Sequence, residues 1–234
     1  RIAELFLEAG LPAGVLNVLP GFGHTVGKAL ALHMDVDTLV FTGSTKIAKQ
    51  LMIYAGESNM KRVWLEAGGK SANIVFADAP CLKTAAEAAA AAICFNQGEM
   101  CTAGSRLLIE RSVKDEFMAL LLEAMKGWKA GHALDPATTV GALVDTGHLN
   151  SVLSYIEAGH AENAKLLCGG KRTLEETGGV YVEPTIFDNV TNSMRIAAEE
   201  IFGPVLSVIT FDTTEEAIQI ANDSIYGLAA AIWT

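Results

Sequence analysis

Short apolar runs alternate with helix-forming stretches along the first third of the chain. Runs of four or five mainly apolar residues, bounded by turn formers or polar residues, predict strands at residues 15–19, 38–41, 62–65 and 72–76. Helices are predicted at residues 1–8, 28–33 and 46–55, the first of them ended by Gly10 and Pro12. This alternation predicts a parallel α/β sheet, in which ligands bind beyond the carboxyl ends of the strands.

The rest of the chain continues the α/β pattern. An alanine-rich stretch at residues 82–95 has no Gly or Pro and predicts a helix, and the apolar run at residues 107–110 predicts a short buried strand. Residues 113–129 predict an amphipathic helix whose apolar stripe is most simply core. Further helices are predicted at 149–158 and 214–222, strands at 165–168, 181–186, 205–211 and 228–234, and a hairpin or loop at 171–179.

The composition and net charge of the chain argue against some classes of binding partner. The 234 residues are 50% hydrophobic and 19% charged, with a net charge of −10, which argues against nucleic acid or an anionic membrane as the main partner. No apolar run approaches the roughly 18 residues that a membrane helix needs. The four cysteines show neither CxxC pairing nor metal-ligand spacing, so we expect no metal site, no disulfide scaffold and a reducing, cytoplasmic setting.

The two termini differ from those of a separate domain. Residue 1 is Arg within a predicted helix, and residues 228–234 stop within a predicted strand. We therefore expect the chain to be an internal piece of a longer protein.

Cys101 is the candidate nucleophile. It lies within residues 95–106, F-N-Q-G-E-M-C-T-A-G-S-R, on a glycine-bracketed connection between the alanine-rich helix and a strand. An ionised thiol is a strong nucleophile that can form and release a thioester. The alternative, a small buried hydrophobic residue, is favoured for a lone Cys. None of the five histidines lies beside Cys101 in sequence, so a Cys–His pair would have to form in space.

Two stretches are candidate phosphate sites. Gly23 and Gly27 lie in a glycine-rich segment before a helix, where a plain turn is an equal alternative. Gly43 and Ser44 lie between a strand and a helix, a geometry that offers backbone N–H groups to phosphate, although Ser44 could simply be an N-cap. Glu66 lies at a strand end before two glycines that permit close approach by a ligand; the alternative is a solvated loop residue.

Four segments taken together carry a resemblance. They are residues 41–45 (F-T-G-S-T), 65–71 (L-E-A-G-G-K-S), 95–106 and 199–205 (E-E-I-F-G-P-V). In this order and spacing they resemble the aldehyde dehydrogenase superfamily, and the similarity extends over the whole chain. Residues 61–73 most resemble the members that oxidise γ-glutamyl-γ-aminobutyraldehyde.

The resemblance implies an activity, a fold and partners. It implies part of a Rossmann-like parallel-sheet cofactor domain over residues 1–69, followed by an incomplete α/β catalytic domain over residues 70–234. The implied reaction is NAD-dependent oxidation of a small aldehyde, with NADP as the alternative cofactor, in a homo-oligomeric full-length protein. Cys101 would form a thiohemiacetal and then a thioester, with the oxyanion held by its own N–H and by an Asn upstream of this chain. Glu66 would activate the hydrolytic water.

The same resemblance assigns the cofactor site. Glu200 would hold the nicotinamide ribose and Phe202 would pack near the nicotinamide end; on residues alone, a helix-end carboxylate and a core aromatic are the simpler interpretation. The remaining assignments are Gly43 and Ser44 at the pyrophosphate, Gly23 and Gly27 on the adenine side, and Asn96 next to the catalytic pocket.

Some positions depart from the family pattern. Ala67 stands in place of the commoner Leu, and Ala48 in place of Gly. The oxyanion Asn and the first nucleotide-binding strand are expected upstream, so an inactive or merely interacting fragment is the alternative function. A relative that transfers the thioester to CoA is a further alternative, against which the presence of Glu66 favours hydrolysis.

Overall fold

Two units make up the chain in the computed structural model, which describes residues 1–234. They are Arg1–Ala67 and Gly68–Thr234. The division falls two residues before the boundary expected from the sequence.

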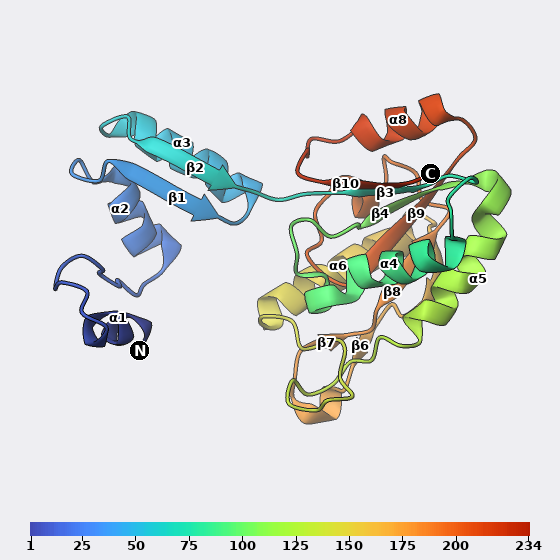
Figure 1. The fold of residues 1–234 in the computed structure, drawn as a ribbon, viewed down its shortest axis with the longest axis horizontal. Coiled ribbons are helices and arrows are strands. Elements are labelled where there is room, and N and C mark those ends of the chain that lie inside the picture. Colours follow the sequence, from blue (N-terminus) through green and yellow to red (C-terminus); the bar gives the residue numbers. More distant parts are fainter. The chain divides into compact units, whose positions relative to one another are not determined.

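The first unit centres on a strand–helix–strand arrangement (Figure 1). Strands β1 and β2 pair in parallel, as the sequence predicts, and Thr42 lies opposite Glu66. Helix α3 buries Ala48, Leu51 and Ala55. The elements are α1 (Ile2–Glu8), η1 (Gly23–Gly27), α2 (Lys28–Leu32), β1 (Thr38–Thr42), α3 (Thr45–Glu57) and β2 (Arg62–Glu66).

Two sequence predictions for this unit are wrong. Residues 15–19 form no strand, and Val15 and Val18 are each 65% exposed. An apolar run becomes a strand only where a neighbouring strand satisfies its backbone groups, and no strand of this chain pairs with this one. The glycine-rich segment is not a turn either, because Gly23–Gly27 is a π-helix that runs directly into α2.

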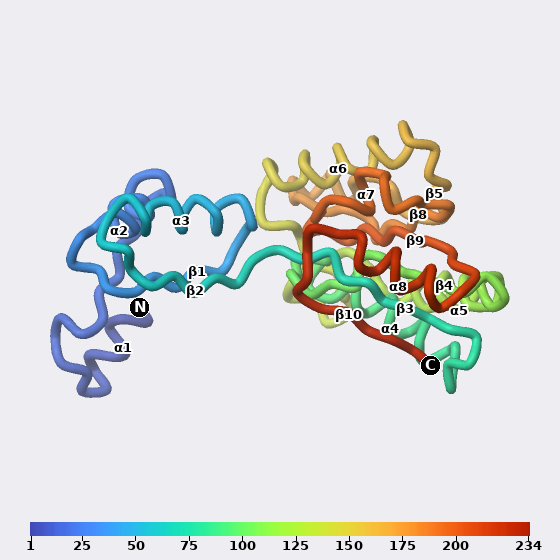
Figure 2. The backbone as a smooth tube through the Cα atoms, turned by 90° about the horizontal axis from the view of Figure 1, so that it is seen from above, coloured from blue at the N-terminus to red at the C-terminus, as the bar shows by residue number.

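The second unit is a six-stranded sheet with helices on both faces (Figures 1 and 2). The strand order is β10-β3-β4-β9-β8-β5, and every pairing is parallel except that of β5 with β8. The strands are β3 (Ala72–Val75), β4 (Arg106–Glu110), β5 (Lys165–Cys168), β8 (Thr185–Asp188), β9 (Val205–Phe211) and β10 (Ala230–Trp233). The helices are α4 (Leu82–Cys94), α5 (Lys114–Met125), α6 (Thr146–Ala161), α7 (Arg195–Ala198) and α8 (Thr214–Asn222).

A core lies on each face of this sheet. Leu107 and Ile109 of β4 pack with α4 and α5, whereas Leu108 between them packs with α6, α7 and α8. Because both faces of β4 are covered, its sequence is continuously apolar rather than alternating, which is why it could be predicted. These layers hold the segments before β3 and β4 in place.

The smaller elements differ in part from the prediction. The single strand expected at residues 181–186 is two strands, β7 (Tyr181–Val182) and β8, separated by Pro184, which has no N–H to donate. β7 pairs with β6 (Arg172–Thr173) as a hairpin. Helix α5 ends at Met125, before Gly127, and is shorter than expected. The short helices α7, η2 (Phe95–Gly98), η3 (Arg111–Val113) and η4 (Glu175–Thr177) were not predicted.

Candidate active site

A short left-handed segment leads from α4 into the loop that carries Cys101. Asn96 and Gln97 have φ values of 49° and 57°, which are uncommon for residues with a side chain and persist where contacts fix them. The Asn96 side-chain amide donates to the Glu99 carbonyl at 3.0 Å, and the Gly141 N–H donates to Gln97 Oε1 at 2.9 Å. The Cys101 loop is therefore held by specific hydrogen bonds.

The four cysteines, all free thiols, occupy different environments. Burial raises the pKa of Cys94 to about 12 and raises that of Cys168, so these two thiols are poor nucleophiles. Cys81 is exposed, and the Thr84 hydroxyl, 3.3 Å from its sulfur, lowers its pKa. Cys101 is partly exposed in its turn. Cys81 is therefore the most exposed thiol, Cys101 and Cys168 are partly exposed, and Cys94 is buried.

Gly69 joins the Cys101 loop to Glu200. Its N–H donates to Glu200 Oε1 at 3.2 Å, and a β-carbon at residue 69 would collide with the carbonyl oxygen of Cys101. A β-carbon at Gly68 would likewise collide with the Glu200 carboxylate. Only glycine permits this close approach of the segment before β3 to both groups. Cys101 and Glu200, about 100 positions apart in the sequence, are thus both in contact with Gly69.

The adjacent carboxylates Glu199 and Glu200 are in contrasting environments. Tyr155 donates to Glu199 Oε2 at 2.8 Å and Arg195 donates to the same oxygen at 3.2 Å. The Tyr155 hydrogen bond, with Arg195, lowers the pKa of Glu199. Burial instead raises the pKa of Glu200, against which the Gly69 N–H and the Lys70 charge act in the opposite direction. The Glu199 carboxylate is thus bound by side chains of the protein, whereas the Glu200 carboxylate can still accept hydrogen bonds from a ligand.

Phe202 lies in the turn after Glu200. Its φ is 56° and its side chain is 40% exposed. His148 Nε2 lies 2.6 Å from the Phe202 carbonyl oxygen and 3.5 Å from Glu99 Oε1. No hydrogen bond joins a histidine to Cys101. The only sequence signal for His148 would have been its place three residues after the capping Asp145.

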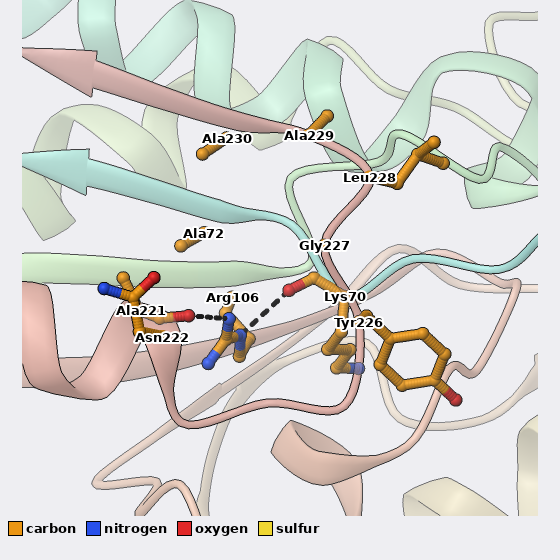
Figure 3. Close-up of a pocket in the computed structure, with 10 residues that line it drawn as sticks. All are labelled: Lys70, Ala72, Arg106, Ala221, Asn222, Tyr226, Gly227, Leu228, Ala229 and Ala230. Carbon is orange, nitrogen blue, oxygen red and sulfur yellow. Dashed lines mark hydrogen bonds between the residues drawn. The ribbon is translucent and has the colours of Figure 1, made fainter.

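One cavity of this unit lies beside two buried basic side chains, Lys70 and Arg106 (Figure 3). It has a volume of about 340 Å³, and none of the site residues predicted from the sequence lines it. Arg106 donates from Nε to the Lys70 carbonyl at 3.0 Å and from its terminal nitrogens to the carbonyls of Ile220 and Ala221, each at 2.9 Å. Arg106 thereby ties the end of α8 to the segment before β3.

Lys70 itself is a buried amine. It is 2% exposed, and its Nζ has no hydrogen-bond partner in the protein. Burial, followed by the charge of Arg106, lowers its pKa to about 7. Lys70 directly follows two glycines in the sequence, and nothing in that pattern predicts that its side chain is buried.

The remaining predicted residues lie in the first unit. Glu66 is exposed at the end of β2, and its carbonyl accepts from the Gly43 N–H at 3.0 Å. Ser44 is the N-cap of α3, where its Oγ accepts from the Ile47 N–H at 3.4 Å. The capping interpretation of Ser44 is therefore confirmed. Its role at a phosphate, through the N–H groups of the first helical turn, stays a prediction.

Gly23 and Gly27 show no close packing that would require glycine. A β-carbon added at either position would meet nothing within 4 Å. Their place in a helix replaces the predicted turn, and their role on the adenine side remains a prediction.

The chain carries neither a helix long and apolar enough to cross a membrane nor a group of three His, Cys, Asp or Glu side chains that could hold a metal ion.

The aldehyde dehydrogenase family model matches residues 1–234, the whole chain. This chain belongs to the aldehyde dehydrogenase family. It spans about half the length of the curated relatives that it matches. One of them, the NADP/NAD-dependent aldehyde dehydrogenase PuuC of Escherichia coli (strain K12), is 56% identical over 234 residues, which are 100% of this chain and 46% of that protein.

Solved structures of two relatives superpose along the whole chain. The indole-3-acetaldehyde dehydrogenase AldA of P. syringae, in complex with NAD+ and IAA, is 76% identical with a TM-score of 0.99 over 47% of its chain. A γ-glutamyl-γ-aminobutyraldehyde dehydrogenase from Burkholderia cenocepacia is 57% identical with a TM-score of 0.97 over 47% of its chain. The family resemblance, including the narrower one, is confirmed, as is the α/β fold class.

We predict that Gly69→Ala destabilises the aldehyde dehydrogenase chain by about 1–3 kcal/mol, the usual cost of overpacking a closed site. The added methyl group would displace the carbonyl of Cys101, which is backbone and cannot swing away. Thermal unfolding measures the loss, expected as a drop of several degrees. Gly227→Ala is the matched control, because its β-carbon meets nothing within 4 Å; equal midpoints for the two variants would contradict the prediction.

We predict that Lys70 makes stability rise with pH. Its folded pKa of about 7 lies below the ordinary value of 10.5, so between these values the unfolded chain binds more protons. The cost of burying the charged amine is fully present below pH 7 and is relieved as pH rises, by at most about 1.4 kcal/mol per pH unit.

Lys70→Met should remove this contribution, so the stability difference between Lys70→Met and the unsubstituted protein should shrink from about pH 7 to about pH 10. Urea unfolding across this range measures it. Lys126→Met, at a side chain that is 71% exposed, is the control. A difference that does not change with pH would refute the assignment.

Proposed function

We propose that the enzyme containing this chain oxidises an aldehyde to a carboxylic acid with NAD or NADP, through a thiohemiacetal and a thioester on Cys101. The observation that carries the proposal is the contact of Gly69 with both the Cys101 carbonyl and the Glu200 carboxylate. In a member of this family, that contact couples the candidate nucleophile to the candidate cofactor residue. Membership of the family supports the reaction class.

The residues present fit a dinucleotide. Glu200 accepts one hydrogen bond, from Gly69, and has lone pairs left for ribose hydroxyls. The exposed ring of Phe202 offers a flat apolar surface to a nicotinamide. The first turn of α3, after Gly43 and Ser44, offers N–H groups to a pyrophosphate. When bound, the cofactor accepts the hydride.

Cys101 carries the covalent chemistry in this proposal. Its thiolate attacks the aldehyde carbon, a C–S bond forms, and the carbonyl electron pair moves to oxygen. The Cys101 N–H would hold this oxyanion, together with the Asn side chain that the family resemblance implies. When the C=O bond reforms, the hydride leaves the carbon and the thioester remains.

Glu66 acts in the second half of the reaction. Its carboxylate takes a proton from water as the water attacks the thioester carbon, and the Cys101 thiolate leaves with the C–S electron pair. The balance is aldehyde, water and oxidised cofactor giving acid, reduced cofactor and a proton. The exposed position of Glu66 at the end of β2 supports access to water.

We propose a small aldehyde as substrate, without a finer choice. The relatives named above act on an indole aldehyde and on a γ-glutamylated amino aldehyde, two molecules of different charge and shape. We also propose Asn96 as a residue beside the pocket, a homo-oligomeric state and a cytoplasmic location; the four free thiols support a reducing compartment.

We predict that Cys101→Ala abolishes aldehyde oxidation, because no other thiol of the chain lies in this loop. Cys81→Ala is the matched control, because Cys81 is also accessible and the Thr84 hydrogen bond lowers its pKa. It should retain activity within about tenfold, equivalent to 1.4 kcal/mol in the barrier. Near-normal turnover of Cys101→Ala would rule out the proposed mechanism.

We predict that Glu66→Gln slows thioester hydrolysis more than hydride transfer. A pre-steady-state burst of reduced cofactor should then precede a slow steady rate. Stopped-flow absorbance of the reduced nicotinamide measures both phases. Loss of the burst along with turnover would instead assign Glu66 to activation of the thiol.

A further inference from the structure

His148 lies where three segments of the second unit meet. It occupies the first turn of α6, where its backbone N–H donates to the carboxylate of the N-cap Asp145 at 2.7 Å. Its side chain is only 18% exposed. The cap fixes the backbone of His148, and therefore the point from which its imidazole projects.

The ring of His148 contacts both the Cys101 loop and the Phe202 turn. Nε2 lies 2.6 Å from the Phe202 carbonyl oxygen, and since a carbonyl can only accept, Nε2 carries the proton. The same N–H faces Glu99 Oε1 at 3.5 Å. That oxygen also accepts the Val144 N–H at 3.0 Å, so Glu99, two residues before Cys101, is fixed as well.

The backbone conformation of Phe202 requires contacts of this kind. Its left-handed backbone is unfavourable for a residue with a side chain and persists where neighbouring groups fix it. The Phe202 and His148 rings meet edge to face, with centroids 6.2 Å apart at 66°. A β-carbon at Gly98 would collide with the Gly203 carbonyl, so the backbones of loop and turn also touch. The orientation of the exposed Phe202 ring is thus set by His148 and by the Cys101 loop together.

We propose that His148 is a positioning residue for the cofactor. By its hydrogen bond to the Phe202 carbonyl it holds that ring in the orientation that packs against the nicotinamide end of the dinucleotide. This inference rests on the function proposed above. His148 acts through Phe202, so its loss weakens cofactor binding and leaves aldehyde recognition unchanged.

The test compares two amides at position 148 in the full-length enzyme. The amide nitrogen of His148→Gln reaches about as far as Nε2, whereas that of His148→Asn stops short of the Phe202 carbonyl. Calorimetric titration should show the Kd for NAD raised about tenfold in His148→Asn and within about threefold of the starting value in His148→Gln. The KM for aldehyde should change in neither. His132→Asn, in an exposed loop, is the control.

Equal NAD affinities for His148→Asn and His148→Gln would overturn the proposal, as would a parallel rise in the KM for aldehyde. Hydrogen exchange of residues 199–204, followed by mass spectrometry, gives a readout independent of activity. It should speed up in His148→Asn alone. If the unsubstituted protein binds no NAD, the proposed function fails. Hydrogen exchange then still tests the contact by itself: faster exchange in His148→Asn would show that His148 orders the Phe202 turn. Unchanged exchange would overturn the role of His148 as well.

Discussion

Contacts between backbones that only glycine permits organise the second unit. Gly69 lies against the Cys101 carbonyl, and Gly98 lies against the Gly203 carbonyl. No side chain separates these segments, so their spacing is set by backbone atoms, which cannot change rotamer. The sheet contributes the other half of the constraint, because β3, β4 and β9 are adjacent in it and fix the segments that precede them. The loop, the turn and the segment before β3 therefore have one mutual arrangement.

Within this arrangement, side chains of the same type differ in their hydrogen-bond partners and in their burial. Glu199 and Glu200 differ by one position, yet Tyr155 and Arg195 bind the first while a single backbone N–H binds the second. The cysteines differ in the same way, since Cys94 is buried against Met125 in the core and Cys101 is on a turn. Environment, and not residue type, decides which of two like groups remains free for a ligand.

Much of this fold could be predicted from the sequence, and the elements and residues that could not be predicted have physical explanations. The run at residues 107–110 was predictable because both faces of β4 are buried. The equally apolar run at residues 15–19 was not, since strand formation depends on a partner that the run itself does not reveal. Ser44 could be assigned as a cap because capping is local, whereas His148 acts on Phe202 across 54 positions. Lys70 was missed because most residues that line the cavity beside it, from Ala221 to Ala230, lie far along the chain.

The strand order of the second unit also has a consequence during synthesis. β10 pairs with β3, and Trp233 donates to the Asn73 side chain at 3.1 Å across 160 positions. β3 and β4 emerge from the ribosome early, but the neighbours of their outer edges, β10 and β9, emerge much later. At 5–20 residues per second, β3 waits on the order of ten seconds with an unpaired edge. A nascent chain of this kind is a candidate for chaperone binding during that interval, because an exposed strand edge is a template for aggregation.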